Sequence, residues 1–224
     1  MRPFGSILFA SAALLSCAII PAHADLVIVQ KVEGGGQGGE ETIKIKGDKS
    51  RTDLNSGVSM IADGATGGMI TLMHSGRTYL KVTPEQTRAM LEQLQKFRFG
   101  SDQAKLQPSG KKEKIGEYDC EIFTTNLGAL TATYWLAKDF PNYPSLLAQL
   151  SKFQSGTFSA MGNGLLPDLK DFPGMTIKTE LTMSGKKIIT TLVSAKEENV
   201  DPATFEIPKG YSEIRSPTLN FQPK

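Results

Sequence analysis

The feature that most constrains this sequence is a run of short alternating segments between Leu26 and Val82, separated by turns of only a few residues. Within the segments apolar and polar residues alternate, as Ile43 and Ile45 do, which is typical of a strand with one buried face. Connections this short join antiparallel neighbours, because a parallel crossover needs a dozen or more residues. The pattern predicts a six-stranded antiparallel meander. Its expected strands are 26–33, 42–46, 49–54, 58–63, 69–74 and 77–82.

After the meander the apolar period changes from two residues to about 3.6. Thr83-Pro84-Glu85-Gln86 places an N-cap Thr before a Pro, with Gln three residues after the cap, which is a helix start signal. The apolar stripe that follows comprises Met90, Leu91, Leu94 and Phe97. Residues 101–114 are polar and contain several Lys, and we expect a loop there.

The second half repeats the order of strands and helix. We expect strands over 115–126 and 130–137, then a helix beginning near Tyr143 or Pro144, and finally strands over 175–183 and 186–196. The apolar stripe of this second helix comprises Leu146, Leu147, Leu150 and Phe153. A sheet with one apolar face and helices to cover it is an α+β solution. We therefore expect one strongly curved antiparallel sheet of about ten strands, with two or three helices on its concave side.

The first 24 residues have the pattern of an export signal. Arg2 precedes an apolar run from Ile7 to Ile20, and Ala22-His23-Ala24 places small residues where a signal peptidase cleaves. We expect cleavage before Asp25, a single domain over 25–224, and a periplasmic or cell-envelope location. The alternative is a lipid anchor on Cys17, which follows Leu14-Leu15-Ser16.

The composition argues against several classes of function. Lys and Arg number 25 against 23 for Asp and Glu, so charge favours no nucleic-acid partner. Beyond residue 24 the chain has one Cys, Cys120, and one His, His74. An intramolecular disulfide is therefore excluded, and a metal site is disfavoured. Cys120 alternates with Tyr118 and Ile122, which favours a buried structural thiol.

Three local motifs resemble functional sites, but none predicts a catalytic, cofactor or metal site. Gly34, Gly36 and Gly39 match G-x-G-x-x-G, but a strand pattern follows where a dinucleotide site needs a helix. His74 adjoins a Ser, yet neighbours in a strand point to opposite faces and no G-x-S-x-G occurs. A structural His74 is the better interpretation. The basic loop that holds Lys105, Lys111, Lys112 and Lys114 is either a solvated connection or a contact with a membrane surface.

Four segments resemble an exported bacterial family known as domain of unknown function 4412. They are Lys46–Arg51, Thr78–Leu80, Trp135–Pro141 and Val200–Tyr211, and the resemblance spans about Leu26 to Tyr211. The closing segment also resembles the lipoprotein-carrier superfamily. That resemblance implies an incomplete β-barrel with helices in its open mouth, and relatives that bind lipid anchors or acyl chains or serve as envelope sensors. It implies no catalytic residue.

The two helical stripes support the functional hypothesis. Either they complete the core, or they form a lid over an apolar ligand such as a lipid, an acyl chain or a lipidated partner. We expect an exported non-enzymatic binding protein with no cofactor. The alternative is an envelope interaction or sensor module whose exposed strand edges pair with a partner.

Overall fold

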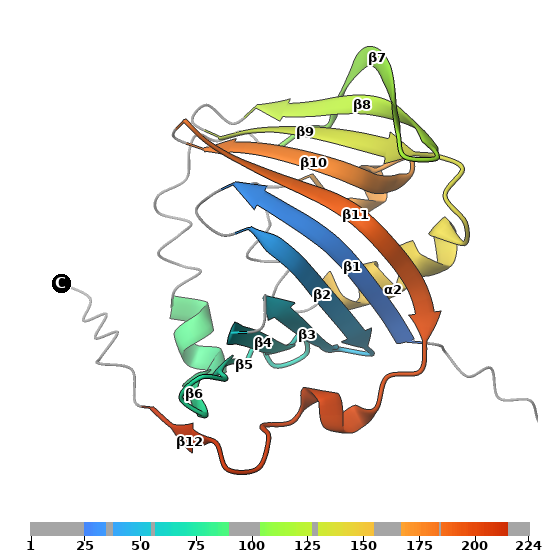
Figure 1. Ribbon diagram of the computed structural model, residues 1–224. Helices are drawn as coiled ribbons and strands as arrows, with labels where there is room; N and C mark the ends of the chain where they lie inside the picture. Colours follow the sequence, from blue (N-terminus) through green and yellow to red (C-terminus); the bar gives the residue numbers. More distant parts are fainter. Residues whose placement is uncertain are drawn as a thin grey trace, which may run out of the picture.

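A computed structural model describes residues 25–34, 38–54, 57–89, 104–126, 130–154, 167–183 and 185–214, with the side chains of 152–154 excepted. Its strands form one open sheet (Figure 1). The first six are β1 (Asp25–Gly34), β2 (Gly39–Lys46), β3 (Lys49–Leu54), β4 (Val58–Asp63), β5 (Met69–Met73) and β6 (Thr78–Val82). The others are β7 (Gln107–Ile115), β8 (Tyr118–Asn126), β9 (Leu130–Ala137), β10 (Met175–Met183), β11 (Lys186–Glu198) and β12 (Ser212–Glu213). The helical segments are 84–89, α2 (Tyr143–Gln154) and the 3₁₀ turns η2 (Leu169–Asp171) and η3 (Pro202–Phe205).

Two meanders meet in the middle of the sheet. The strand order is β12-β6-β5-β4-β3-β2-β1-β11-β10-β9-β8-β7, so the predicted six-stranded meander is confirmed. β1 pairs with β11 from Asp25↔Glu198 to Gly34↔Ile188, which joins the second meander to the first. Neighbours are antiparallel except that β12 runs parallel to β6.

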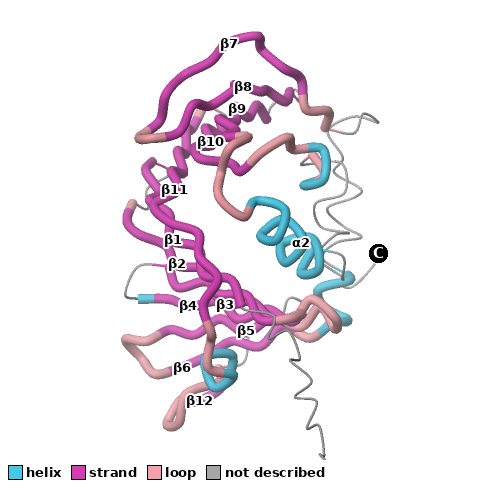
Figure 2. The backbone as a smooth tube through the Cα atoms, turned by 90° about the vertical axis from the view of Figure 1, so that its right-hand side faces the viewer, coloured by secondary structure: helices cyan, strands magenta, loops and turns pink. Residues whose placement is uncertain are grey.

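The sheet bends around α2, which lies on its concave side (Figure 2). Two register shifts mark the bend, one where Val29 and Gln30 pair with Ser194 and Leu192, and one between Thr176 and Lys178. Such bulges increase the local twist and bend a strand. A curved sheet with an inner and an outer face results, as the sequence predicts.

Both faces of the first meander carry core residues. Leu26, Ile28 and Ile45 pack in one cluster with Leu146 of α2, which fixes their face as the concave one. The intervening positions face outward, and there Ile61 and Leu72 pack with Val200, Phe205 and the rest of the segment after β11. In the second meander β9 is buried on both sides, since Trp135 and Ala137 belong to one cluster and Tyr134 and Leu136 to another.

The expectation of about ten strands was too low, because the sheet has twelve. β7 occupies part of the expected loop over 101–114: its residues are almost all exposed, so no apolar alternation marks it. β12 has only two residues, too few to show a period. The first helix does begin as predicted. The Thr83 amide donates to Gln86 Oε1 (2.9 Å) and the Gln86 amide to Thr83 Oγ1 (3.3 Å).

Candidate functional site

The candidate site is the concave face of the first meander. Strand register places its residues in cross-strand rows, one of which runs Ile28↔Ile43↔Thr52↔Met60↔Thr71↔Leu80. Directly opposed residues share a face, so this row continues the face on which α2 lies. Over β3 to β6 this face carries a set of apolar side chains that we call the concave patch: Leu54, Val58, Met60, Met69, Met73, Leu80 and Val82.

None of the seven side chains in the concave patch is buried. Met60 is 39% exposed, whereas Ile61, its neighbour on the outward face, is 5% exposed and Leu72 is fully buried. Among the described large apolar side chains of β3 to β6, the exposed one, Met60, therefore lies on the inner face, while Ile70 and Tyr79 on the outward face are half-buried. An incompletely covered apolar surface in a concave setting is what a binding site for an apolar ligand requires.

The second helical stripe belongs to α2, which packs on the concave face near β1 and β2 rather than near the concave patch. Leu146 is 2% exposed and belongs to the core, while Leu147 and Leu150 are half-buried. At the start of α2, Ser145 Oγ and Gln149 Nε2 (2.9 Å) donate to the Glu197 carboxylate of β11. The helix therefore contacts the sheet through one deeply buried leucine, flanking half-buried side chains and exposed polar bonds.

The remaining residues of the two stripes lie outside the described parts of the chain. They are Met90, Leu91, Leu94 and Phe97 of the first stripe and the side chain of Phe153. The expected export signal over 1–24, with Cys17, also lies outside them. Whether the two stripes meet over the concave face therefore stays a prediction.

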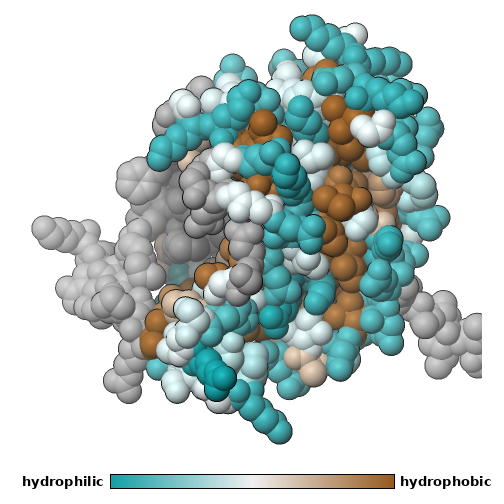
Figure 3. Space-filling view, in the orientation of Figure 1, coloured by the Kyte–Doolittle hydropathy of each residue, from teal (hydrophilic) through white to brown (hydrophobic). Residues whose placement is uncertain are grey.

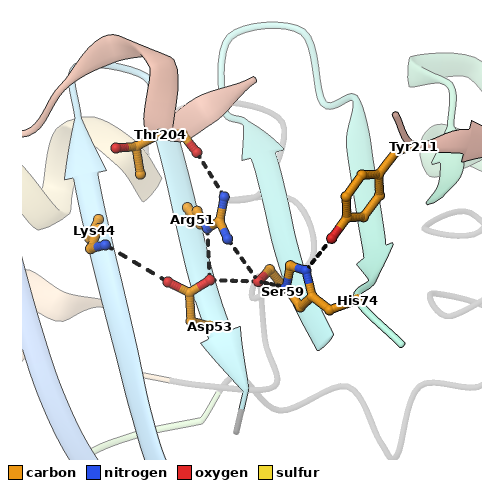
Figure 4. Close-up of polar contacts among 7 residues, drawn as sticks. All are labelled: Lys44, Arg51, Asp53, Ser59, His74, Thr204 and Tyr211. Carbon is orange, nitrogen blue, oxygen red and sulfur yellow. Dashed lines mark hydrogen bonds and ion pairs between the residues drawn. The ribbon is translucent and has the colours of Figure 1, made fainter. Parts of the chain in front are cut away.

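A chain of hydrogen bonds crosses the outward face of the same strands (Figure 4). Ser59 Oγ lies 2.5 Å from Asp53 Oδ1 and 2.7 Å from His74 Nε2, and His74 Nδ1 lies 2.6 Å from Tyr211 Oη. Arg51 donates to Asp53 Oδ1 (2.7 Å), to Ser59 Oγ (3.0 Å) and to the Thr204 carbonyl (3.1 Å). When the Ser59 hydroxyl donates to Asp53, its oxygen can accept from Arg51 and from His74 Nε2.

Ser, His and Asp are adjacent in this network, but the arrangement is not that of a hydrolase. A catalytic Asp bonds to the His and orients it, whereas here Asp53 bonds to Ser59. Ser59 is also only 1% exposed, so a substrate carbonyl has no access to its hydroxyl. The sequence interpretation of His74 as a structural residue agrees with these contacts.

Asp53 is the titrating group that this network perturbs. Burial by itself raises the pKa of the Asp53 carboxyl, but hydrogen bonds from Ser59 and Arg51 and the charges of Arg51 and Lys44 outweigh it. The pKa of Asp53 therefore lies below its ordinary value. The carboxylate stays ionised and holds Arg51 in place.

Two of the sequence segments that carry the family resemblance contact each other on this outward face. Lys46 Nζ donates to the Val200 carbonyl (3.0 Å) and to Asp25 Oδ2 (2.6 Å), which also accepts from the Val200 amide (2.9 Å). Arg51 reaches Thr204 as described above. The 46–51 segment thus binds the backbone of the 200–211 segment, and the two motifs form one structural unit that covers the outward face.

Other chemical groups in the described residues offer no second site. Cys120 is 1% exposed, and burial raises the pKa of its thiol, which confirms the expected buried cysteine. No group of three or more His, Cys, Asp or Glu in the described residues is arranged to hold a metal ion. Within that part of the chain, no helix has the length and apolar character to cross a membrane. After Gly34, the chain returns as β2, so the Gly-rich motif does not precede a helix.

Three of the four lysines of the predicted basic loop lie on the outer edge strand of the sheet, and Lys105 precedes that strand. Lys111, Lys112 and Lys114 lie on β7, which pairs with β8 through a register shift between Pro108 and Lys112. Lys, Pro and bulges are devices that block pairing with further strands. This edge is therefore poorly suited to the edge-pairing alternative.

Apolar side chains also reach the surface on the convex side. Figure 3 shows a band of them over β1 and β11. Val193 of β11 is 60% exposed, at the register shift between β1 and β11. This band is flanked by hydrophilic side chains (Figure 3).

Sequence reasoning missed the concave patch and the polar network. The signal for both was present in the spacing of the strand residues: Arg51 and Asp53 share one face of β3, while Thr52 and Leu54 share the other. Separating the two faces of each strand would have placed Arg51 and Asp53 together, whereas the extent of the concave patch also depends on the register between strands.

Comparison with known proteins gives a family and several weak structural likenesses. A family model described as a domain of unknown function (DUF4412) matches residues 28–211, which confirms the resemblance to that family. Among curated proteins, none matches this chain.

The solved structures that match share little sequence with the chain. One of PNGF-II has a TM-score of 0.43 at 12% identity, with 86% of this chain and 32% of that chain covered; this chain thus spans about a third of its length. A putative outer membrane lipoprotein-sorting protein domain from Vibrio parahaemolyticus has a TM-score of 0.33 at 9% identity, covering 83% and 90%. LprF from Mycobacterium bovis has a TM-score of 0.36 at 11% identity, covering 80% and 87%. With TM-scores below 0.5, these likenesses carry no argument about function.

Proposed function

The chain belongs to the DUF4412 family, and from this premise we propose that it is a non-enzymatic binding protein that holds an apolar ligand on the concave face of its sheet. The ligand class is a lipid, an acyl chain or the lipid of a lipidated partner. The observation that carries the proposal is the concave patch, whose seven apolar side chains are all incompletely buried.

The composition of the concave patch suits such a ligand. Three of its members are methionines, whose unbranched polarizable side chains adapt to apolar surfaces of different shape. Burial of an alkyl chain against them is favourable by about 0.8 kcal/mol for each methylene removed from water. No directional group is needed, because this driving force depends on the area buried.

In this proposal α2 covers part of the bound apolar chain and shields it from water. Its half-buried Leu147 and Leu150 lie beside the buried Leu146, on the concave side of the sheet. In the proposed mechanism a bound chain lies along the concave patch and extends toward these leucines. Binding is then reversible, since no covalent step takes part.

The absence of an enzymatic role is part of the proposal. Its support is that Ser59, His74 and Asp53, which are the nearest approach to a catalytic group, are committed to holding the 200–211 segment. We also propose that the protein acts in the periplasm or cell envelope after removal of residues 1–24, with a Cys17 anchor as the alternative.

Fluorescent fatty-ester binding to delipidated protein tests the proposal. We expect saturable binding at micromolar concentration, weakened at least about fivefold by Met60→Gln, because a polar amide replaces a contact of the alkyl chain. Met183→Gln is the matched control: Met183 is also exposed (53%), but it lies on β10, separated from β4 by β3, β2, β1 and β11. No saturable binding, or equal weakening by both variants, would contradict a site on the concave patch.

The interaction-module alternative has one observation in its favour, the apolar band over β1 and β11 (Figure 3). At the β7 edge, the lysines and the bulge disfavour the edge-pairing form of this alternative.

A further inference from the structure

The distribution of charged side chains between the two faces of β1 to β6 restricts which apolar ligands fit. Resting on the proposed function, we infer that the group next to the apolar chain is neutral or positively charged, and that a free carboxylate or phosphate is excluded from the concave face. A glyceride, an ester-linked or amide-linked acyl chain, or a cationic amphiphile fits this description. An ionised fatty acid does not.

The basic residues of the first meander all lie on its outward face. Register places Lys44 and Arg51 in the row Val27↔Lys44↔Arg51↔Ile61↔Ile70↔Lys81. Lys46 pairs with Lys49 on the same outward face, and Lys31 pairs with Glu40 there. Among the described residues of β1 to β6, no Lys or Arg side chain therefore belongs to the concave face.

The concave face of these six strands instead carries a carboxylate. Glu41 pairs with Gln30 and with Leu54, which belongs to the concave patch, and Gln30 Nε2 donates to Glu41 Oε2 (3.1 Å). A second carboxylate on this face, Glu197, pairs with Leu26 and receives the hydrogen bonds from the start of α2. Among the described residues of β1 to β6, the polar side chains on the concave face are therefore acidic or neutral.

Among the described side chains of β1 to β6, an anion on this surface would find no partner of opposite charge. Transfer of a carboxylate from water to an apolar surface is unfavourable unless it is paired and hydrogen-bonded, and Glu41 adds repulsion between like charges. A neutral glyceride avoids both effects. A cationic group gains attraction from Glu41.

The test compares three amphiphiles with the same dodecyl chain: laurate, monolaurin and dodecyltrimethylammonium. Each displaces a neutral fluorescent probe from the delipidated full-length mature protein, below its micelle concentration and at a pH where laurate is ionised. We expect monolaurin and dodecyltrimethylammonium to bind at least about tenfold more tightly than laurate. We also expect Glu41→Gln to weaken dodecyltrimethylammonium alone, about threefold or more, and to leave monolaurin unchanged.

Glu40→Gln is the matched control, because Glu40 is the adjacent carboxylate on the same strand and faces outward. We expect it to change none of the three affinities. Laurate binding as tightly as monolaurin would overturn the inference and leave the proposed function standing. If neither the probe nor any amphiphile binds, the proposed function fails and the inference fails with it.

Discussion

At the scale of single residues, one carboxylate organises the outward face. Asp53 accepts hydrogen bonds from Ser59 and Arg51, and Arg51 in turn holds the Thr204 carbonyl. Loss of the Asp53 charge leaves a partly buried Arg51 without its counter-ion, which is more costly than loss of an exposed pair.

Asp53→Asn should therefore lower the free energy of unfolding at neutral pH by about 2 kcal/mol. Because the pKa of Asp53 is lowered in the folded protein, its contribution is fully present above the unfolded pKa of about 3.9 and is lost as pH falls through the folded pKa. The difference between wild type and variant should then shrink below about pH 4. Urea unfolding across this range measures it.

Asp48→Asn provides the control, since Asp48 lies exposed in the turn between β2 and β3. We expect that variant to follow the wild-type pH profile. A difference between Asp53→Asn and wild type that does not change with pH would contradict the assigned role of the Asp53 charge.

At the scale of elements, substitution of two adjacent leucines of α2 should change the free energy of unfolding by very different amounts. Leu146→Ala should lower the free energy of unfolding by about 3 kcal/mol, because it leaves a cavity at a core position. Leu147→Ala removes a half-buried side chain and should cost less than about 1.5 kcal/mol. If ligand contacts Leu147, this variant weakens fatty-ester binding while it remains nearly as stable as wild type. Equal stability losses would contradict the orientation of α2.

The sequence predicts a strand correctly where alternating apolar residues and flanking turn residues mark its ends. β3, β4, β9 and β10 have the predicted bounds, because alternation and turn residues both mark their ends. β7 was missed because an edge strand with exposed lysines has no buried face to produce alternation. The concave patch depends on register across four strands, and no single segment of sequence contains that information.

At the scale of the whole molecule, an open sheet must keep its edges from pairing with other copies. At one edge β12 pairs with Thr78 and Tyr79 of β6 only, and the other edge is β7 with its lysines and register shift. We expect Lys112→Thr combined with Lys114→Thr to promote self-association that rises with concentration. Light scattering coupled to size-exclusion chromatography measures it.

Lys186→Thr combined with Lys196→Thr removes the same charge from β11, which has neighbours on both sides. That variant should elute as the wild-type protein does. Self-association of this control to the same extent would show that net charge, rather than the β7 edge, prevents aggregation.

The pairing of β1 with β11 has a consequence for how the chain folds during synthesis. β1 is the first strand made, and its partner is completed only at Glu198. Until β11 pairs with β1, the two meanders are separate, with β1 and β10 as unpaired edges. Pairs so distant in sequence form slowly, because a long loop must close before they do. Before that loop closes, both unpaired edges are open to pairing with other chains.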